Sequence, residues 1–299
     1  MQSNDWMSAV LEHRAPMEPR PTELAPRRMQ LQDVQVVLLD VYGTLVISGS
    51  GDVGTADESE PADQVIAACA AQLGMEDPSS LPTMTEIKSA ITTLNQASRS
   101  EGNPKPEIEI LSVWRMVLQQ HGRDDLTHDP AAVCRLACLV EARLNPTWPM
   151  PGAADALHQL HAAGTRLGIV SNAQVFTIPI VEDLIGDRLE SRFDLNLCYF
   201  SNRFRASKPG PLMFERVRAE LGRLGYAAHQ AVYIGNDMLN DVWAASQVGL
   251  RTVLFAGDAR SLRQRGDHAS CSALSADVVL THWNQLVDCL PERAMRARL

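Results

Sequence analysis

The stretch from Val36 to Leu45 reads VVLLDVYGTL and decides how the rest of the chain is interpreted. Its first four residues are apolar and partly β-branched, which is typical of a short buried strand. Asp40 follows at once, and a Gly43-Thr44 turn comes shortly after it. A strand that ends in this way presents its aspartate at the edge of a sheet. We therefore predict that Asp40 acts as a nucleophile.

The body of the chain alternates between strand and helix patterns. Apolar runs predict strands at Val34–Leu39, Arg166–Val170, Leu195–Phe200, Ala231–Ile234, Thr252–Phe255 and Val278–Leu280. Helical patterns lie between them at Ala153–Ala163, Pro211–Leu224 and Asn240–Val248. This alternation predicts an α/β fold with a doubly wound parallel sheet. Ligands bind beyond the carboxyl ends of such strands. Asp40, Ser171, Lys208 and Asp241 are expected to converge there.

Residues 47–148 interrupt the alternation. Four amphipathic segments are expected to be helices: Pro61–Leu73, Thr85–Gln96, Glu107–His121 and Pro130–Leu144. Thr83 and Glu86 have the spacing of a capping box at the start of the second helix. We predict three parts: a flexible N-terminal arm over residues 1–32, a core formed by residues 33–46 and 149–299, and a helical cap over residues 47–148. The glycines after the nucleophile strand, Gly49, Gly51 and Gly54, predict a hinge into the cap.

Composition limits the partners and the cellular compartment. The chain has 299 residues and a net charge of −9, which disfavours binding to nucleic acids or anionic membranes. No apolar run reaches the length of about 18 residues that a membrane span needs. The N-terminus lacks a signal-peptide pattern, and the six cysteines show no tight metal spacing. We expect a cytoplasmic protein with free thiols, no nucleic-acid or membrane partner, and a small anionic substrate; a homodimer remains open.

Four motifs in order resemble those of the haloacid dehalogenase (HAD) superfamily. They are Asp40 to Leu45, Ser171-Asn172, Lys208-Pro209 and Gly235 to Asp241, and the resemblance spans roughly residues 34–290. It implies the core and inserted cap described above.

The resemblance also implies a role for each motif residue. Asp40 would be the covalent nucleophile, Lys208 would balance its charge, and Asp241 would position water or metal. Ser171 and Asn172 would bind the substrate anion. Thr44 and Asn236 would complete the substrate-binding set, and Tyr42 belongs to the catalytic set.

Tyr42 bears most strongly on the reaction. HAD phosphatases carry D-x-D-G-T, in which the second aspartate protonates the leaving alcohol, and this chain has Tyr42 in its place. A tyrosine with an ordinary pKa of about 10 is poorly suited to that role near neutral pH. A halide leaves without a proton, and D-x-Y-G-T-L is close to the motif of 2-haloacid dehalogenases. Tyr42 thus favours displacement at carbon.

The fourth motif, Gly235 to Asp241, does not support the dehalogenase-like reaction that Tyr42 favours. Phosphatases read G-D-x-x-x-x-D, whose first aspartate binds Mg²⁺; here that position is Asn236, a weaker ligand. Asp237 lies next to it and offers a substitute carboxylate. The S-x-N-x-x-D pattern of dehalogenases is also absent, because Met238 replaces its asparagine. Phe214 likewise stands where dehalogenases have a tyrosine.

Trp114-Arg115 resembles a cap segment of dehalogenases whose arginine holds the departing halide. It lies further from the nucleophile than that pattern expects, so a surface arginine beside a core tryptophan is the alternative. Arg203 and Arg205, upstream of Lys208, predict an anion-attracting loop or else a solvated one.

Three functions follow from these features. The first is dehalogenase-like displacement at carbon of a small organic acid, with no cofactor. The second is a Mg²⁺-dependent phosphomonoesterase that binds the metal through Asp40, Asp241 and Asp237. The third is a catalytically weakened HAD domain with a binding role, because two motif carboxylates are replaced.

Overall fold

The computed structural model describes residue 11 and residues 15–51, 61–75 and 80–290. Six parallel strands form the main sheet, in the order β5-β4-β1-β6-β7-β8. Their bounds are β1 Val36–Leu39, β4 Arg166–Ser171, β5 Cys198–Phe200, β6 Ala231–Gly235, β7 Arg251–Phe255 and β8 Val278–Leu280. The predicted α/β fold with a doubly wound parallel sheet is therefore confirmed.

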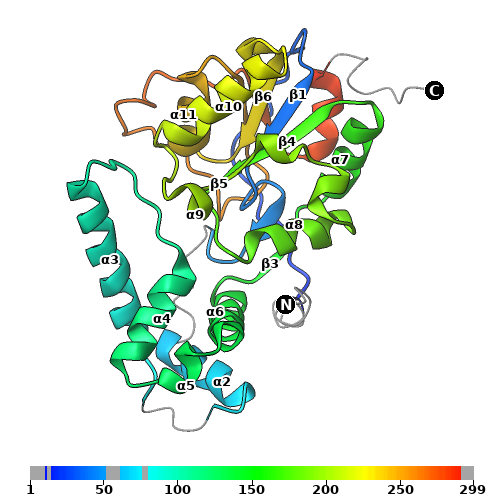
Figure 1. The fold of residues 1–299 in the computed structure, drawn as a ribbon. Helices are drawn as coiled ribbons and strands as arrows, with labels where there is room; N and C mark the ends of the chain where they lie inside the picture. The colour runs from blue at the N-terminus through cyan, green and yellow to red at the C-terminus, as the bar shows by residue number, and fades with distance from the viewer. Residues whose placement is uncertain (1–10, 12–14, 52–60, 76–79, 291–299) are drawn as a thin grey trace.

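Helices cover both faces of this sheet (Figure 1). The core helices are α7 Ala153–Ala162, α8 Thr177–Ile185, α9 Ser201–Phe204, α10 Leu212–Arg223 and α11 Ala244–Ser246. Short 3₁₀ helices are η2 Leu189–Ser191, η3 Leu195–Leu197, η4 Ala228–Gln230 and η6 Trp283–Cys289, and η5 Met238–Trp243 is a π-helix.

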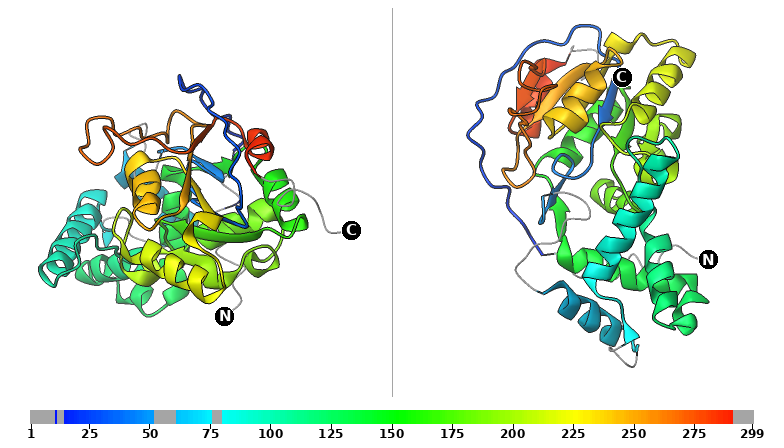
Figure 2. Two further views of the ribbon diagram at one scale, coloured as in Figure 1. Left: turned by 90° about the horizontal axis from the view of Figure 1, so that it is seen from above. Right: turned by 90° about the vertical axis from the view of Figure 1, so that its left-hand side faces the viewer.

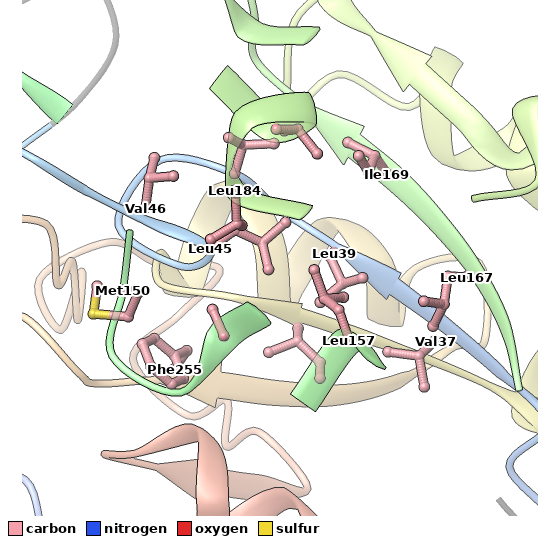
Figure 3. Close-up of a cluster of buried hydrophobic side chains, with 14 of the residues drawn as sticks. Val37, Leu39, Leu45, Val46, Met150, Leu157, Leu167, Ile169, Leu184 and Phe255 are labelled. Carbon is pink, nitrogen blue, oxygen red and sulfur yellow. The ribbon is translucent and has the colours of Figure 1, made fainter. Parts of the chain in front are cut away.

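Side chains of β1 alternate between two apolar layers. Val37 and Leu39 pack with the residues of α7, α8 and η6, while Val36 and Leu38 pack with those of α10 and α11. Figure 3 shows the first layer, in which Leu157 of α7 lies beside the strand residues. Each fully buried aliphatic side chain of this kind contributes about 1.5–3 kcal/mol. Both faces of the sheet are thus covered by helices. The predicted site residues are therefore expected at the carboxyl edge of the sheet.

The segment between β1 and α7 contains the predicted helices. They are α2 Ala62–Gln72, α3 Met84–Ser100, α4 Ile110–Gln120 and α6 Pro130–Leu144; the short helix α5 Asp124–Thr127 was not predicted. All five gather at one end of the sheet (Figure 1). The capping box is confirmed, because Thr83 Oγ1 accepts from the amide of Glu86 while the Glu86 carboxylate accepts from the amide of Thr83. The α2–α6 group has its own apolar core, centred on side chains such as Trp114 and Leu136.

A two-stranded antiparallel ribbon joins this helical group to the core. It consists of β2 Val46–Ser48 and β3 Thr147–Pro149. Gly49 and Gly51 follow β2, and the amide of Gly49 donates to the carbonyl of Pro146. Gly54, the third glycine of the predicted hinge, lies outside the described residues. The division into arm, core and cap stays a prediction, with this ribbon at the predicted junctions.

Residues 15–32 run along the core rather than away from it (Figure 2). Arg27 exchanges two backbone hydrogen bonds of 2.9 Å with Val279 of the edge strand β8. Leu31 is buried, and its amide donates to the carbonyl of Cys289. The flexible arm over residues 1–32 stays a prediction. Within the described part of that segment, Arg27 is bonded to the edge strand, where it covers unpaired strand groups.

Candidate active site

Asp40 lies directly after β1 at the carboxyl edge of the sheet. Its amide donates to the carbonyl of Ile234 at 2.9 Å, which fixes the main chain between β1 and β6. The side chain is largely buried, and one carboxylate oxygen accepts a 2.8 Å hydrogen bond from Lys208 Nζ. Among the described residues, Asp40 Oδ2 has no such bond. Oδ2 is therefore the oxygen that the predicted nucleophile role would use.

Lys208 is the centre of a buried polar network. Its ammonium contacts Asp40 at 2.8 Å, Asp241 at 2.6 Å and the hydroxyl of Tyr233 at 2.9 Å. Burial by itself lowers the pKa of Lys208, but the charges of Asp241 and Asp40 outweigh it and raise the pKa above its usual value. Lys208 thus remains charged, as its predicted role requires.

Asp241 is also fully buried and accepts hydrogen bonds at both oxygens. Oδ1 accepts from Lys208, and Oδ2 accepts from the amide of Asp237 at 2.9 Å. Burial raises the pKa of Asp241 to about 6, although the Lys208 ammonium acts in the opposite direction. A carboxyl with this pKa can gain or lose a proton near neutral pH.

Tyr233 completes this network and is the residue that the sequence did not identify. Its hydroxyl donates to the carbonyl of Val170 at 2.6 Å and accepts from Lys208. Burial raises the pKa of Tyr233 well above its usual value, so the hydroxyl keeps its proton. The ring packs edge-on against Phe214. Phe214 replaces the tyrosine of the dehalogenase pattern, and the structure supplies a tyrosine hydroxyl to Lys208 from β6 instead.

Thr44 and Asn236 bond to each other. Thr44 Oγ1 donates to the amide oxygen of Asn236 at 3.1 Å, and the Asn236 amide nitrogen donates to the carbonyl of Ser261 at 2.6 Å. Gly43 lies between them with φ of +76°, and a β-carbon there would be 2.3 Å from that of Ser261. The turn therefore needs glycine at position 43, because the segment that contains Ser261 packs directly against it.

Tyr42 is buried and held by a neighbour. Its hydroxyl lies 3.0 Å from Thr177 Oγ1 at the start of α8. Thr177 Oγ1 in turn accepts from the amide of Gln174. Tyr42 also lines the pocket at Asp40, so its ring forms part of the wall.

Ser171 and Asn172 lie at the end of β4 but differ in position. Asn172 lines the pocket, and its side chain bonds the main chain of Lys208, accepting from the amide at 2.8 Å. Ser171 is fully buried, and its hydroxyl donates to the carbonyl of Asn172. Ser171 is not among the pocket-lining residues. Asn172 thus positions the loop that carries Lys208.

The arginines that the sequence singled out lie away from Asp40. Arg203 stacks over the ring of Phe200, and the carbonyl of Arg205 accepts from the amide of Glu107. Neither guanidinium lines the pocket at Asp40. Trp114 is buried in the α2–α6 core, and Arg115 lines neither the pocket nor the cavity beside it.

Two spaces lie at the carboxyl edge of the sheet, and one of them is lined by Asp40. A small pocket of about 20 Å³ is lined by Asp40, Tyr42, Gly51, Asn172, Lys208, Asn236, Asp237, Asn240, Asp241, Ser261 and Arg263. A larger cavity of about 320 Å³ lies between helices α3, α4 and α6 and the core loops. Asn172 lines both spaces. The walls of the larger cavity are mostly apolar and include Ile87, Ile91 and Trp114.

Comparison with known proteins decides the family. The sequence model of the haloacid dehalogenase-like hydrolases matches residues 34–249. The chain belongs to this family. The structure of a 2-haloacid dehalogenase from Pseudomonas syringae pv. Tomato aligns with a TM-score of 0.51 and 17% identity, covering 85% of this chain and 96% of that one. This HAD hydrolase therefore has the fold that its motifs predicted.

Two curated relatives of this HAD hydrolase are named phosphatases. A ribulose-1,5-bisphosphate 5-phosphatase from Halopiger xanaduensis is 28% identical over 139 residues, 46% of this chain and 55% of the relative. A glyceraldehyde 3-phosphate phosphatase from Methanothermobacter thermautotrophicus is 28% identical over 131 residues, 44% of this chain and 54% of the relative. The chain thus spans about half the length of the curated relatives it matches.

The residues of this HAD hydrolase do not fit a Mg²⁺ site in the conformation described. Asp237 caps η5 through the amides of Leu239 and Asn240 and forms an ion pair with Arg265 at 2.7 Å. Asp241 is used at both oxygens, and Asn236 contributes no charge. Among the described residues, no three His, Cys, Asp or Glu side chains are arranged to hold a metal ion. Within the described part of the site, Asp40 Oδ2 is the carboxylate oxygen left without a hydrogen bond, whereas Mg²⁺ prefers several oxygen ligands.

The structure also contains no membrane-spanning candidate among its described helices, since none combines the required length with sufficient hydropathy.

Proposed function

We propose that this HAD hydrolase displaces a leaving group from carbon in a small organic acid, as a 2-haloacid dehalogenase does. The position of Tyr42 carries the proposal. The side chain that replaces the phosphatase acid is buried and bonded to Thr177, so the site offers no carboxyl there to protonate a leaving alcohol. A leaving halide needs no such proton.

In the proposed reaction, Asp40 Oδ2 attacks the carbon that bears the halogen. The new C–O bond forms as the C–halogen bond breaks, and the electron pair leaves with the halide. Lys208 opposes the charge of Asp40 through an ion pair of 2.8 Å. The product of this step is an ester between Asp40 and the organic acid.

Water then hydrolyses the ester. Its oxygen adds to the carbonyl carbon of Asp40, the bond to the former Oδ2 breaks, and the proton that water loses passes to this leaving oxygen, which releases a hydroxy acid. Asp241 is the proposed acceptor of the water proton, because its pKa of about 6 leaves it largely ionised at neutral pH. The hydroxyl oxygen of the first product therefore comes from Asp40, and the oxygen of water enters the protein.

The direct test is a single turnover in ¹⁸O-labelled water with 2-chloropropanoate. We expect halide release, unlabelled lactate and one ¹⁸O atom in the peptide that contains Asp40, all unaffected by EDTA. Asp40→Asn is the matched control and should release no halide. Labelled lactate in the first turnover, or halide release by Asp40→Asn, would contradict the proposal.

The names of the two curated relatives favour a second candidate, a phosphomonoesterase. It would need Mg²⁺, and Asp237 would have to leave Arg265 to bind it. Phosphate release from a panel of phosphomonoesters, with Mg²⁺ and with EDTA, separates the two candidates. Release that requires both Mg²⁺ and Asp40 would favour the phosphatase.

A further inference from the structure

Residues 256–277, between β7 and β8, return over the catalytic pocket and contribute two side chains to its wall, Ser261 and Arg263. The main chain of this loop is bonded to the fourth motif. The amide of Arg263 donates to the carbonyl of Asn236 at 3.0 Å, and the carbonyl of Arg263 accepts from the amide of Met238 at 2.8 Å. The loop is thus held at a fixed position relative to Asp241.

The guanidinium of Arg263 forms its hydrogen bonds to the protein through one nitrogen, Nη1. Nη1 donates to the carbonyls of Arg260 at 2.6 Å and Leu262 at 3.2 Å. Among the described residues, no carboxylate pairs with Arg263, and its Nε–Nη2 edge has no partner. That edge has the two parallel N–H groups that bind a carboxylate in a bidentate manner.

Gly51 provides the space beside this edge. Its φ is +84°, and a β-carbon there would lie 2.9 Å from Arg263 Nη2 and 2.4 Å from the carbonyl of Arg260. Any other residue at position 51 would be strained and would press on the guanidinium. Glycine therefore allows the chain leaving β2 to pass close to Arg263.

Ser261 supplies a second donor in the wall of the same pocket. The side chain is fully buried and lines the catalytic pocket, yet its hydroxyl has no hydrogen-bond partner within the described part of the chain. A buried hydroxyl without a partner costs about 1–3 kcal/mol. A ligand in the pocket that accepts a hydrogen bond would remove this cost.

The charges of the pocket also require a further cation. Asp40, Lys208 and Asp241 together carry a net charge of −1 when both carboxylates are ionised, and Asp237 is neutralised by Arg265. An anionic substrate would be repelled by that excess. Arg263 balances it, so that an anion can approach Asp40.

We propose that Arg263 and Ser261 form the subsite for the substrate carboxylate. This inference rests on the proposed function, because it assumes that the substrate is an organic acid. The Nε–Nη2 edge of Arg263 receives the two carboxylate oxygens, and Ser261 Oγ donates to one of them. The subsite replaces the role that the sequence gave to Ser171 and Asn172, whose side chains are bonded to the protein itself.

Binding of butanoate to the full-length Asp40→Asn protein tests the subsite without turnover. Calorimetric titration should give a Kd that weakens by about 10- to 100-fold when Arg263→Gln is added. Ser261→Ala, a smaller change, should weaken it by about 5- to 10-fold. Arg263→Lys should be intermediate, because lysine keeps the charge without the fork. Arg218→Gln, on the exposed side of α10, is the charge-matched control and should leave the Kd unchanged.

Inorganic phosphate is titrated in parallel, and circular dichroism confirms that each variant is folded. Absence of butanoate binding to Asp40→Asn, an unchanged Kd in Arg263→Gln, or binding of phosphate alone would each overturn the carboxylate subsite. These readouts are independent of halide release, so loss of the proposed reaction and loss of the subsite can be told apart.

Discussion

The ammonium group of Lys208 lies 2.6 Å from Asp241 Oδ1, and both side chains are almost completely buried. The same nitrogen lies 2.8 Å from Asp40. One cation thus separates two buried carboxylates that would otherwise repel each other. Lys208 therefore links Asp40, the proposed nucleophile, to Asp241, the group proposed to accept the proton of water.

Replacing Lys208 by Met should abolish turnover and lower stability. Two buried carboxylates would lose their cation, at a cost of about 3–5 kcal/mol near neutral pH. Without the lysine, the pKa of Asp241 should rise further, so the folded protein would bind a proton that the unfolded chain does not bind. The loss of stability in Lys208→Met should therefore become smaller as the pH falls from 7.5 to 5. Urea unfolding at both pH values measures it, with Arg218→Gln as control; an equal loss at both would contradict the explanation.

Replacing Tyr233 by Phe should reduce kcat while leaving the fold intact. The hydroxyl links Lys208 to the carbonyl of Val170, and its removal frees both groups. We expect a loss of about 10- to 100-fold in kcat with little change in KM, and about 1–3 kcal/mol in stability from the unpaired buried carbonyl. Steady-state kinetics and urea unfolding measure the two effects. Full activity in Tyr233→Phe would show that Lys208 needs no support from β6.

Local patterns in the sequence predicted most of the sheet and the Asp40–Lys208–Asp241 cluster. Asp40 follows β1 directly, whereas Lys208 and Asp241 lie in the segments that come after β5 and β6. Parallel strands bring these segments to one edge of the sheet. Tyr233 could not be recognised, because it lies inside an apolar strand and its hydroxyl reaches Lys208 only through the pairing of β6 with β1. Arg263 and Ser261, which form the proposed subsite, could not be singled out, because their loop has no periodicity and its path depends on contacts with Asn236 and Met238.

Two elements near the site were missed for other physical reasons. Helix α8 contains Pro179, which is tolerated because it lies in the first turn, where the missing N–H has no intrahelical partner. The β2–β3 ribbon has only three residues in each strand, and its partners are about one hundred residues apart in the chain. Three residues are too few to show the alternation of apolar and polar side chains, or the composition, by which a strand is recognised.

The pH dependence of kcat should follow Asp241. Its pKa is raised to about 6, so the carboxylate is ionised at pH 7.5 and becomes protonated below pH 6. A protonated Asp241 cannot accept the proton of water, and kcat should fall about tenfold per pH unit below pH 6. Stopped-flow measurements should show ester hydrolysis slowing on this limb while the halide burst persists. A kcat that is flat from pH 5 to pH 7.5 would exclude Asp241 from this role.

Filling the larger cavity should change the preference for substrate length. Its walls include Ile91, Ile87 and Trp114, and Asn172 lines both this cavity and the pocket at Asp40. Each methylene buried there contributes about 0.8 kcal/mol, so kcat/KM should rise about fourfold per added carbon in a series of 2-chloro acids. Ile91→Trp should remove this gain for the longer acids and leave the shortest one unaffected. Thr92→Trp, an exposed position on the same helix, is the control. Equal length dependence in both variants would show that the carbon chain does not enter this cavity.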